Sequence, residues 1–183
     1  MRADAERNRE RIVEVARQVF KERGLDAPLD EIARRAGVGP GTLYRHFPTR
    51  EALHDAVMQL WIAQVQEHVD KALATEGGPR AQLLAWFIEY VQLLTRHKGS
   101  ASAITTALGV SDSPIRSKCQ AYAQANEKVL DMLRAEGVLR GDVDNLSVCR
   151  LVGGVATMAD QACLSVDAVR PMLEVVADGL LKD

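Results

Sequence analysis

Hydrophobic residues recur at helical spacing along nearly the whole chain. The N-terminal series is Ile12, Val15, Ala16, Val19 and Phe20. These positions follow the i, i+3, i+4, i+7, i+8 pattern of one apolar helix face, so we expect an amphipathic helix over residues 7–23. Gly24 is expected to end this helix, because glycine readily adopts the left-handed conformation that closes a helix.

The same spacing, interrupted by helix-breaking residues, predicts further helices. We expect them over residues 50–73, 80–96, 113–136, 145–163 and 167–181, with two short helices inside residues 29–47. Thr49, Asp144 and the Ser113–Pro114 pair have the residue types of helix N-termini. The chain is therefore predicted to be all-α with about nine helices. We expect an N-terminal three-helix domain over residues 1–48 and a larger helical domain over residues 49–183.

The segment over residues 29–47 has the pattern of a helix-turn-helix. Leu43 and Phe47 lie one turn apart on its second helix. Gly37 falls between the two helices, where the chain needs a backbone conformation that glycine adopts most easily. Val38 can fill the angle between them. Such a unit carries its second helix into the major groove of DNA.

The second short helix is expected to have a dense polar face. Gly39 would be its N-cap and Pro40 its first residue, as the rule for proline at helix starts predicts. Small residues at this end allow close approach of the backbone to a surface. The residues away from the buried side are Pro40, Gly41, Thr42, Tyr44, Arg45 and His46. Side chains this bulky and polar are expected to be exposed because they contact a partner.

The predicted helix over residues 80–96 is apolar almost all round, which is typical of a centrally buried helix. Its narrow polar edge consists of Gln82, Glu89, Gln92 and Arg96. The aromatic residues of this helix either line a ligand cavity or fill an ordinary core, and the sequence favours neither. The candidates for lining a cavity are Trp61, Trp86, Phe87, Tyr90, Ile104, Tyr122, Asn126 and Met158. Tyr122 and Asn126, if buried, need polar partners, and a polar ligand atom is one option.

The last two predicted helices, over residues 145–163 and 167–181, are too apolar to be left uncovered on a monomer. A second copy of the chain would cover them by forming a four-helix bundle. The candidates for this contact are Leu151, Gly153, Gly154, Met172, Leu173, Val176 and Leu180. Glycine inside a helix costs about 1 kcal/mol relative to alanine, so we expect another helix to approach the glycine pair closely. Pro171 is expected in the first turn of the last helix.

Charge is distributed unevenly. Residues 1–50 contain 11 basic and 8 acidic side chains, whereas residues 51–183 contain 12 and 17, within a net charge of −2. A basic end on an acidic body is compatible with presenting that end to a polyanion.

Several classes of protein are disfavoured. No apolar run reaches the roughly 18 residues of a membrane span, and the N-terminus has no apolar signal segment, so we expect a cytoplasmic protein without a membrane partner. Cys119, Cys149 and Cys163 have no metal-ligand or disulfide spacing, and His54 and His68 lack partners at useful positions. No metal, no cofactor and no enzymatic activity are predicted, because the phosphate-loop, nucleophile-elbow and dinucleotide motifs are all missing.

Residues 8–55 resemble the DNA-binding domain of the tetracycline-repressor (TetR) family. The resemblance is carried by Ile12, Ala16, Phe20 and Gly24, then by the run L-D-E-I-A-R-R-A-G-V, and then by G-T-L-Y-R-H-F-P-T-R-E-A-L. It implies that Thr42, Tyr44 and His46 contact phosphates or nearby base edges. It also implies that Pro40, Gly41 and Arg45 lie where the family reads sequence. Arg50 matches a basic position that grips phosphate.

Two departures from the family pattern concern helix caps. Ala27–Pro28 stands where the family often has a capping Thr or Ser, and Gly39–Pro40 replaces its usual Ser-Lys. Both changes make Arg45 the best candidate for direct readout of guanine.

The resemblance implies a homodimeric repressor that binds a near-palindromic operator in double-stranded DNA. An unidentified, small and mainly apolar effector would release the repressor from DNA. The alternative is a DNA-binding regulator without a small-molecule effector, whose cavity is filled by its own aromatic residues or whose activity a partner controls.

Overall fold

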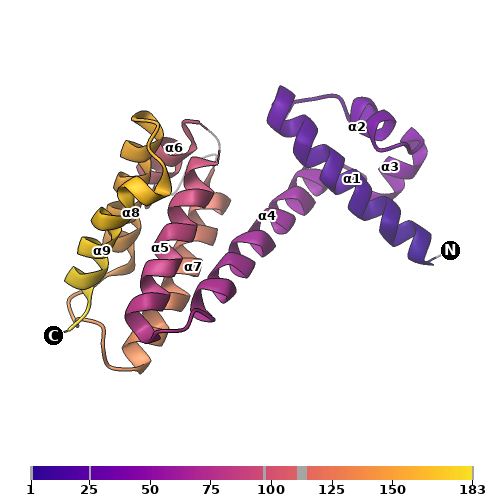
Figure 1. The fold of residues 1–183 in the computed structure, drawn as a ribbon. Helices are drawn as coiled ribbons and strands as arrows, with labels where there is room; N and C mark the ends of the chain where they lie inside the picture. Colours follow the sequence, from indigo (N-terminus) through magenta and orange to yellow (C-terminus); the bar gives the residue numbers. More distant parts are fainter. Residues whose placement is uncertain (1, 25, 97, 111–114, 183) are drawn as a thin grey trace. The chain divides into compact units, whose positions relative to one another are not determined.

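The computed structural model describes residues 2–24, 26–96, 98–110 and 115–182, with side chains from residue 4 onward (Figure 1). Within these ranges the fold is all-α, as predicted, and the one β-type pairing is an isolated bridge between Leu139 and Leu181. The helices are α1 (Arg2–Arg23), α2 (Leu29–Arg35), α3 (Pro40–His46), α4 (Arg50–Leu73), α5 (Gly78–Thr95), α6 (Ser100–Ala107), α7 (Arg116–Ala135), α8 (Asn145–Gln161) and α9 (Val166–Leu180).

The chain forms two compact units, residues 1–61 and 62–183. The first unit extends beyond the helix-turn-helix, whose predicted end is residue 48. It does so because Leu53 and Val57, on the first turns of α4, belong to the helix-turn-helix core.

The first unit is held together by one apolar cluster. It combines Ile12, Val13, Ala16, Val19, Phe20, Ala27, Leu29, Ile32, Ala33, Ala36, Leu43, Phe47, Leu53 and Val57. Helix α1 begins at Arg2 rather than near residue 7, so the predicted start was wrong. The additional residues at the start of α1 have no apolar stripe. Ion pairs between neighbouring turns stabilise this part of the helix, for example Arg7 with Asp4 at 2.5 Å.

The turn between α2 and α3 has the predicted conformation. Gly37 has φ +65°, and its N–H donates to Arg34 O at 3.2 Å, while the Val38 N–H donates to Ala33 O at 3.0 Å. This pair of bonds is the Schellman arrangement, which satisfies the last carbonyls of a helix. Val38 packs against the apolar cluster. The angle between the two short helices is therefore fixed by local backbone bonds and by one apolar contact.

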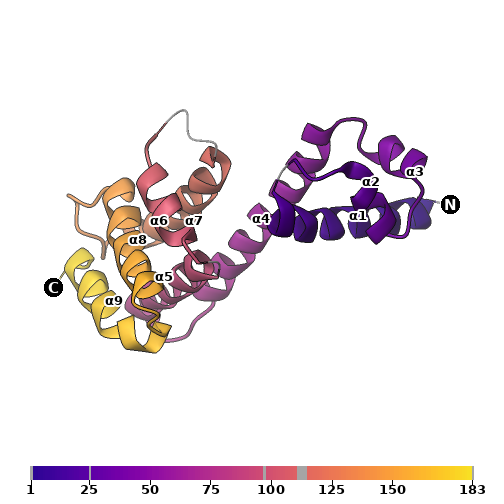
Figure 2. The same ribbon diagram turned by 90° about the horizontal axis from the view of Figure 1, so that it is seen from above.

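In the second unit, α5, α8 and α9 run side by side in both views (Figures 1 and 2), and α6 and α7 pack against α5 and α8. Helix α5 is buried nearly all round, as its composition predicted. Asp144 caps α8 by accepting the Ser147 N–H at 2.9 Å, which confirms the predicted cap. The predicted start of α7 at Ser113–Pro114 lies outside the described residues.

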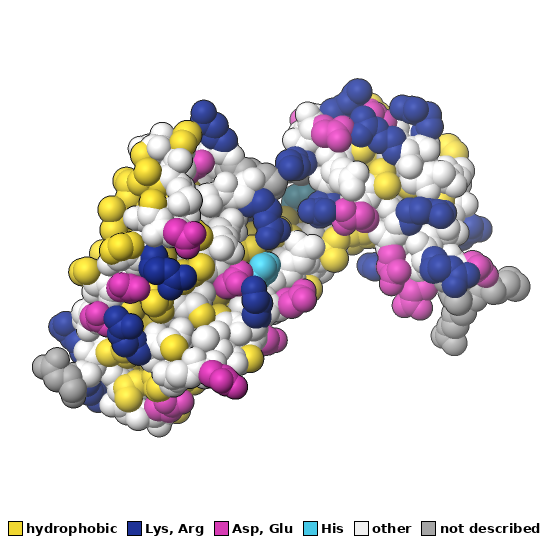
Figure 3. Space-filling view, viewed as in Figure 1, with side chains coloured by type: hydrophobic (Ala, Val, Ile, Leu, Met, Phe, Trp, Pro, Cys, Tyr) yellow, Lys and Arg dark blue, Asp and Glu magenta, His cyan; other side chains and the backbone are white. Residues whose placement is uncertain are grey.

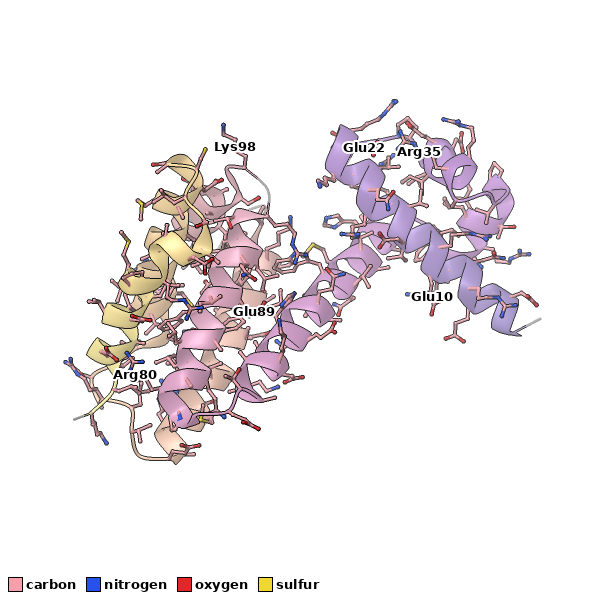
Figure 4. The ribbon with its side chains drawn as sticks, in the orientation of Figure 1. Glu10, Glu22, Arg35, Arg80, Glu89 and Lys98 are labelled. Atoms are coloured by element: carbon pink, nitrogen blue, oxygen red, sulfur yellow. The ribbon has the colours of Figure 1, made fainter. Side chains whose placement is uncertain are left out.

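One sequence prediction about this unit was wrong. Pro171 does not lie in the first turn of α9 but inside the helix, which begins at Val166 after the Ser165 cap. Glu89, on the predicted narrow polar edge of α5, is only 9% accessible. Figure 4 labels Glu89 on α5. His68 and Lys71 on α4 provide the partners that make its burial possible, with His68 Nδ1 at 2.7 Å and Lys71 Nζ at 2.6 Å from the carboxylate.

The Glu89 carboxylate is stabilised in its charged form. Burial by itself raises the pKa of Glu89, but the hydrogen bonds from Lys71 and then His68 outweigh burial and hold the pKa below its usual value. The C-terminal half of α4 is thus joined to α5 by a buried charged group. His68, for which the sequence offered no metal-ligand partners at helical spacing, has the Glu89 carboxylate as its partner.

Candidate nucleic-acid interface

Helix α3 has one buried side and one exposed side. Leu43 is 0% exposed and the C-cap residue Phe47 is 2% exposed, and these two residues anchor the helix in the core of the first unit. Between them, Tyr44 is 47% exposed although it is a large aromatic residue. Because the anchored positions are one turn apart, the intervening side chains are held outward on a fixed backbone.

The polar residues predicted to contact DNA lie on this outward side. Pro40, Gly41, Tyr44 and Arg45 are exposed, and Thr42 and His46 are half-buried. Arg45 Nη2 lies 3.4 Å from Thr42 Oγ1, a long contact that leaves most of the guanidinium donors to solvent. Gly39 is the N-cap, Pro40 is the first residue, and no side chain caps the helix, as predicted.

Arg50 has a partner that the sequence did not reveal. Its Nη1 donates to the backbone oxygen of Ala27 at 2.6 Å, which connects the first residue of α4 to the segment before α2. The adjacent Thr49 is the predicted cap of α4, since its Oγ1 accepts the Ala52 N–H at 3.1 Å. Helix α2 has Pro28 as its N-cap and no side-chain cap bond, in agreement with the predicted departure from the family pattern.

Basic side chains lie over the outer surface of the first unit, many of them beside acidic ones (Figure 3). Arg35 pairs with Glu22 at 2.6 Å and with Glu31 at 2.8 Å, connecting α2 to α1 (Figure 4). Arg9 on α1 lies over the ring of Phe47, with its guanidinium carbon 5.4 Å from the ring centroid. This cation–π contact places a basic side chain of α1 beside the C-terminal end of α3.

The aromatic residues proposed for a ligand cavity contact one another in the second unit. Tyr90 stacks on Trp86 with centroids 5.3 Å apart and on Tyr122 with centroids 4.9 Å apart. Trp86 Nε1 donates to Asn126 Oδ1 at 2.9 Å, and Asn126 Nδ2 donates to Asn145 Oδ1 at 2.8 Å. The buried Asn126 therefore has protein partners, so a ligand atom is not needed to satisfy it.

The other cavity candidates are placed in several environments. Phe87 is 0% and Ile104 is 5% exposed, so both belong to the core, whereas Met158 on α8 is half-buried. Trp61 is half-buried at the end of the first compact unit. The Tyr90 hydroxyl is buried, and the thiol of Cys149 lies beside it. Burial raises the pKa of Tyr90 well above its usual value, so its hydroxyl stays protonated.

A pocket of the second unit is lined by none of these aromatic residues. It has a volume of about 300 Å³ and is open to solvent. Residues from the end of α6, the start of α7 and the first turn of α8 line it: Ala107, Leu108, Gly109, Val110, Arg116, Cys119, Gln120, Ala123 and Leu146. None of the predicted cavity residues is in this lining. Hydrophobic periodicity does not predict this pocket, because residues at helix ends form most of its lining.

The residues proposed for dimerisation divide into two groups. Leu151 and Met172 are 51% and 44% exposed, Gly154 is exposed and Val176 is half-buried, so they are accessible for a second copy. The fold of the chain itself buries the other three. These three are Gly153, Leu173 and Leu180.

The packing of α8 on α6 explains part of this burial. A Cβ on Gly153 would lie 2.5 Å from Thr105 Oγ1, so the close approach predicted for this glycine is to α6 of the same chain. The sequence missed Val175, which is 72% exposed and the most accessible large apolar residue of α9. Apolar side chains gather along the edge of the second unit that α8 and α9 form (Figure 3).

The described residues contain no cluster of metal-ligating side chains and no helix that could span a membrane. Cys119 and Cys149 are buried and unpaired, and burial raises the pKa of the Cys149 thiol to about 11. A thiol with such a pKa stays protonated at neutral pH and is a poor nucleophile or ligand.

Two family descriptions match the chain. Residues 12–57 match bacterial regulatory proteins of the tetR family, and residues 78–182 match the C-terminal domain of SbtR-like transcriptional regulators. An HTH-type transcriptional regulator of Staphylococcus aureus (strain USA300) is 45% identical over 60 residues. That match spans 32% of this chain and only 32% of the regulator's own length.

Solved structures match over nearly the full length. The TetR transcriptional regulator SCO0520 from Streptomyces coelicolor is 34% identical, with a TM-score of 0.58, over 94% of this chain and 98% of its own. A TetR regulatory protein from Mycobacterium vanbaalenii is 32% identical, with a TM-score of 0.60, over 99% of both chains. FadR from Bacillus subtilis, solved in complex with stearoyl-CoA, is 17% identical with a TM-score of 0.66 over 92% and 96%, and this likeness concerns the fold alone.

Proposed function

This chain belongs to the TetR family of bacterial regulatory proteins, and from that membership we propose that it is a homodimeric repressor released from DNA by a small ligand. One observation carries the DNA-binding part of the proposal. Leu43 and Phe47 are buried, whereas Tyr44 between them is 47% exposed. A large aromatic residue held outward on an anchored helix is suited to contact with a partner surface.

In the proposed complex, α3 lies in the major groove. Thr42, Tyr44 and His46 contact phosphates or nearby base edges, and Pro40 and Gly41 allow the backbone to approach the DNA. Arg45 reads a guanine through its two parallel donors. Its contact with Thr42 supports this role, because at 3.4 Å this bond is long and it uses only one of the guanidinium donors. Two copies of α3 about 34–36 Å apart would read a near-palindromic operator in successive major grooves.

The proposed dimer contact lies on the exposed sides of α8 and α9. Leu151, Gly154, Met172 and Val175 provide apolar or small surface there, with Val176 at the edge. Exposing a contiguous patch of such residues to water costs free energy. Pairing with a second copy removes the patch from water. A four-helix bundle made from two α8–α9 pairs is the simplest symmetric arrangement.

The proposed effector is small and mainly apolar. FadR from Bacillus subtilis, which shares this fold, was solved in complex with stearoyl-CoA, a ligand with a long acyl chain. Here an apolar ligand would have to separate Trp86, Tyr90 and Tyr122 or occupy the neighbouring pocket of about 300 Å³. The ligand would release DNA only through a difference in affinity between two conformers.

A regulator without a small-molecule effector is the second candidate. The 2.9 Å bond between Trp86 and Asn126 favours it, because the polar groups of these two side chains already have partners within the protein. Catalysis is disfavoured, since the regulator family is not an enzyme class and the chain lacks the common catalytic motifs.

A selection experiment tests the DNA-binding part. The full chain is used to enrich duplexes from a random library, and we expect inverted half-sites with one helical turn between their centres. Arg45→Ala should broaden the sequences selected, whereas Arg34→Ala, a control on the exposed face of α2, should not. Enrichment of no motif by the wild-type chain would contradict the proposal. Thermal shifts with apolar compounds then separate the two candidates, because only an effector-controlled repressor gains stability from one of them.

A further inference from the structure

Arg50 makes a contact that a phosphate-gripping residue does not require. Its Nη1 lies 2.6 Å from the backbone oxygen of Ala27, and the side chain is half-buried. We propose that Arg50 is a positioning residue: it holds the start of α2, and through α2 the recognition helix α3, instead of gripping a DNA phosphate. The inference rests on the proposed function, in which the outer side of α3 contacts DNA.

The Ala27 carbonyl is in need of a partner. Ala27 is 3% exposed, and a buried backbone oxygen without a hydrogen bond costs free energy. The following residue, Pro28, is the N-cap of α2, carries no side-chain cap and has no backbone N–H. The local sequence therefore contributes little to fixing the start of α2. The guanidinium of Arg50, on α4, fixes the start of α2 through its bond to the Ala27 oxygen.

A short rigid path leads from this contact to α3. Helix α2 is only seven residues long, and its end is tied to the turn by the Val38 N–H bond to Ala33 O at 3.0 Å and the Gly37 N–H bond to Arg34 O at 3.2 Å. Helix α3 begins directly after this turn and has no side-chain cap at Gly39. The placement of α3 thus depends on the placement of α2, which Arg50 anchors.

The two roles for Arg50 have different consequences for DNA binding. Loss of a phosphate contact weakens binding to every duplex alike and reduces the slope of log K against log salt by about 0.9. Loss of an anchor misplaces α3, so it weakens binding to the operator but leaves the salt slope and the binding to unrelated DNA unchanged. Comparing two duplexes over a range of salt concentrations therefore separates the roles.

The test uses the full chain with Arg50→Met, which keeps an unbranched side chain but has no donor and no charge. Affinities are measured for the selected operator and for an unrelated duplex of equal length at several salt concentrations. We expect operator affinity to fall about tenfold or more, with unrelated binding and the salt slope unchanged. Arg17→Met is the matched control, since Arg17 pairs with Glu14 inside α1 and its loss removes one charge without the anchor.

Three results would each overturn the proposal: an equal loss of affinity for both duplexes, a salt slope of log K lower by about 0.9, or no loss of affinity for either duplex. A second measurement needs no variant. In the DNA-free wild-type protein, the guanidinium protons of Arg50 should exchange with water more slowly than those of the exposed Arg34, and equal exchange rates would refute the anchor. If the wild-type chain selects no DNA, the proposed function fails, while guanidinium exchange still decides whether Arg50 holds Ala27.

Discussion

Gly153→Ala should destabilise the protein although alanine is the better helix former. At a helix position with open space around it, replacing glycine by alanine raises the free energy of unfolding by about 1 kcal/mol. Here the new Cβ would lie 2.5 Å from Oγ1, 3.0 Å from Cγ2 and 3.2 Å from Cβ of Thr105. Rotation of Thr105 cannot relieve the contact, because any staggered rotamer leaves a heavy atom in one of the two crowded positions.

The backbone of α6 or α8 must therefore move apart. Overpacking of this kind costs about 1–3 kcal/mol, so the net effect of Gly153→Ala is a loss of about 0–2 kcal/mol. Gly154→Ala is the matched control, because its Cβ meets no atom of the chain within 4 Å. If the Gly154→Ala protein has the same dimer content as the wild type, its free energy of unfolding should be about 1 kcal/mol higher.

The assay is thermal unfolding followed by circular dichroism, with dimer content checked by sedimentation. For a chain of this size each kcal/mol corresponds to about 2–4 °C in Tm, so the two alanine variants should be clearly separated. Thr105→Ala combined with Gly153→Ala should recover stability relative to the sum of the single changes. A Gly153→Ala protein as stable as the Gly154→Ala protein would refute the reasoning.

Three further predictions concern other parts of the chain. Tyr44→Ala should lower operator affinity about tenfold with unchanged Tm, and equal affinity at matched salt would contradict the role of α3. Val175→Asp should give a folded monomer in sedimentation at micromolar concentration, because it places a charge in the proposed dimer contact; a persistent dimer would place that contact elsewhere. Glu89→Gln should cost about 1–3 kcal/mol at neutral pH, since Lys71 and His68 lose a charged acceptor. Because the Glu89 pKa is depressed, this stabilisation should be lost as pH falls below the usual value of 4.5, and urea unfolding that shows a constant difference down to acid pH would exclude it.

Local features of the sequence were sufficient for most of the fold. The bounds of α4, the cap at Asp144 and the turn at Gly37 followed from residue types within a few positions of one another. Apolar periodicity placed Leu43 and Phe47 in the core and thereby predicted the exposed side of α3. These features are readable because helix caps, turns and helix faces depend on interactions between residues that are close in the chain.

The tertiary structure decided what lies opposite each residue. The sequence did not identify His68 and Lys71 of α4 as the partners of Glu89, nor Thr105 of α6 as the close neighbour of Gly153. Arg50 likewise finds its partner in Ala27, which lies 23 residues earlier in the chain. Hydrophobic periodicity shows which side of a helix is apolar. The partner of a buried charge, a glycine or a guanidinium is a residue of a distant segment, and only the packing of the helices determines which segment lies there.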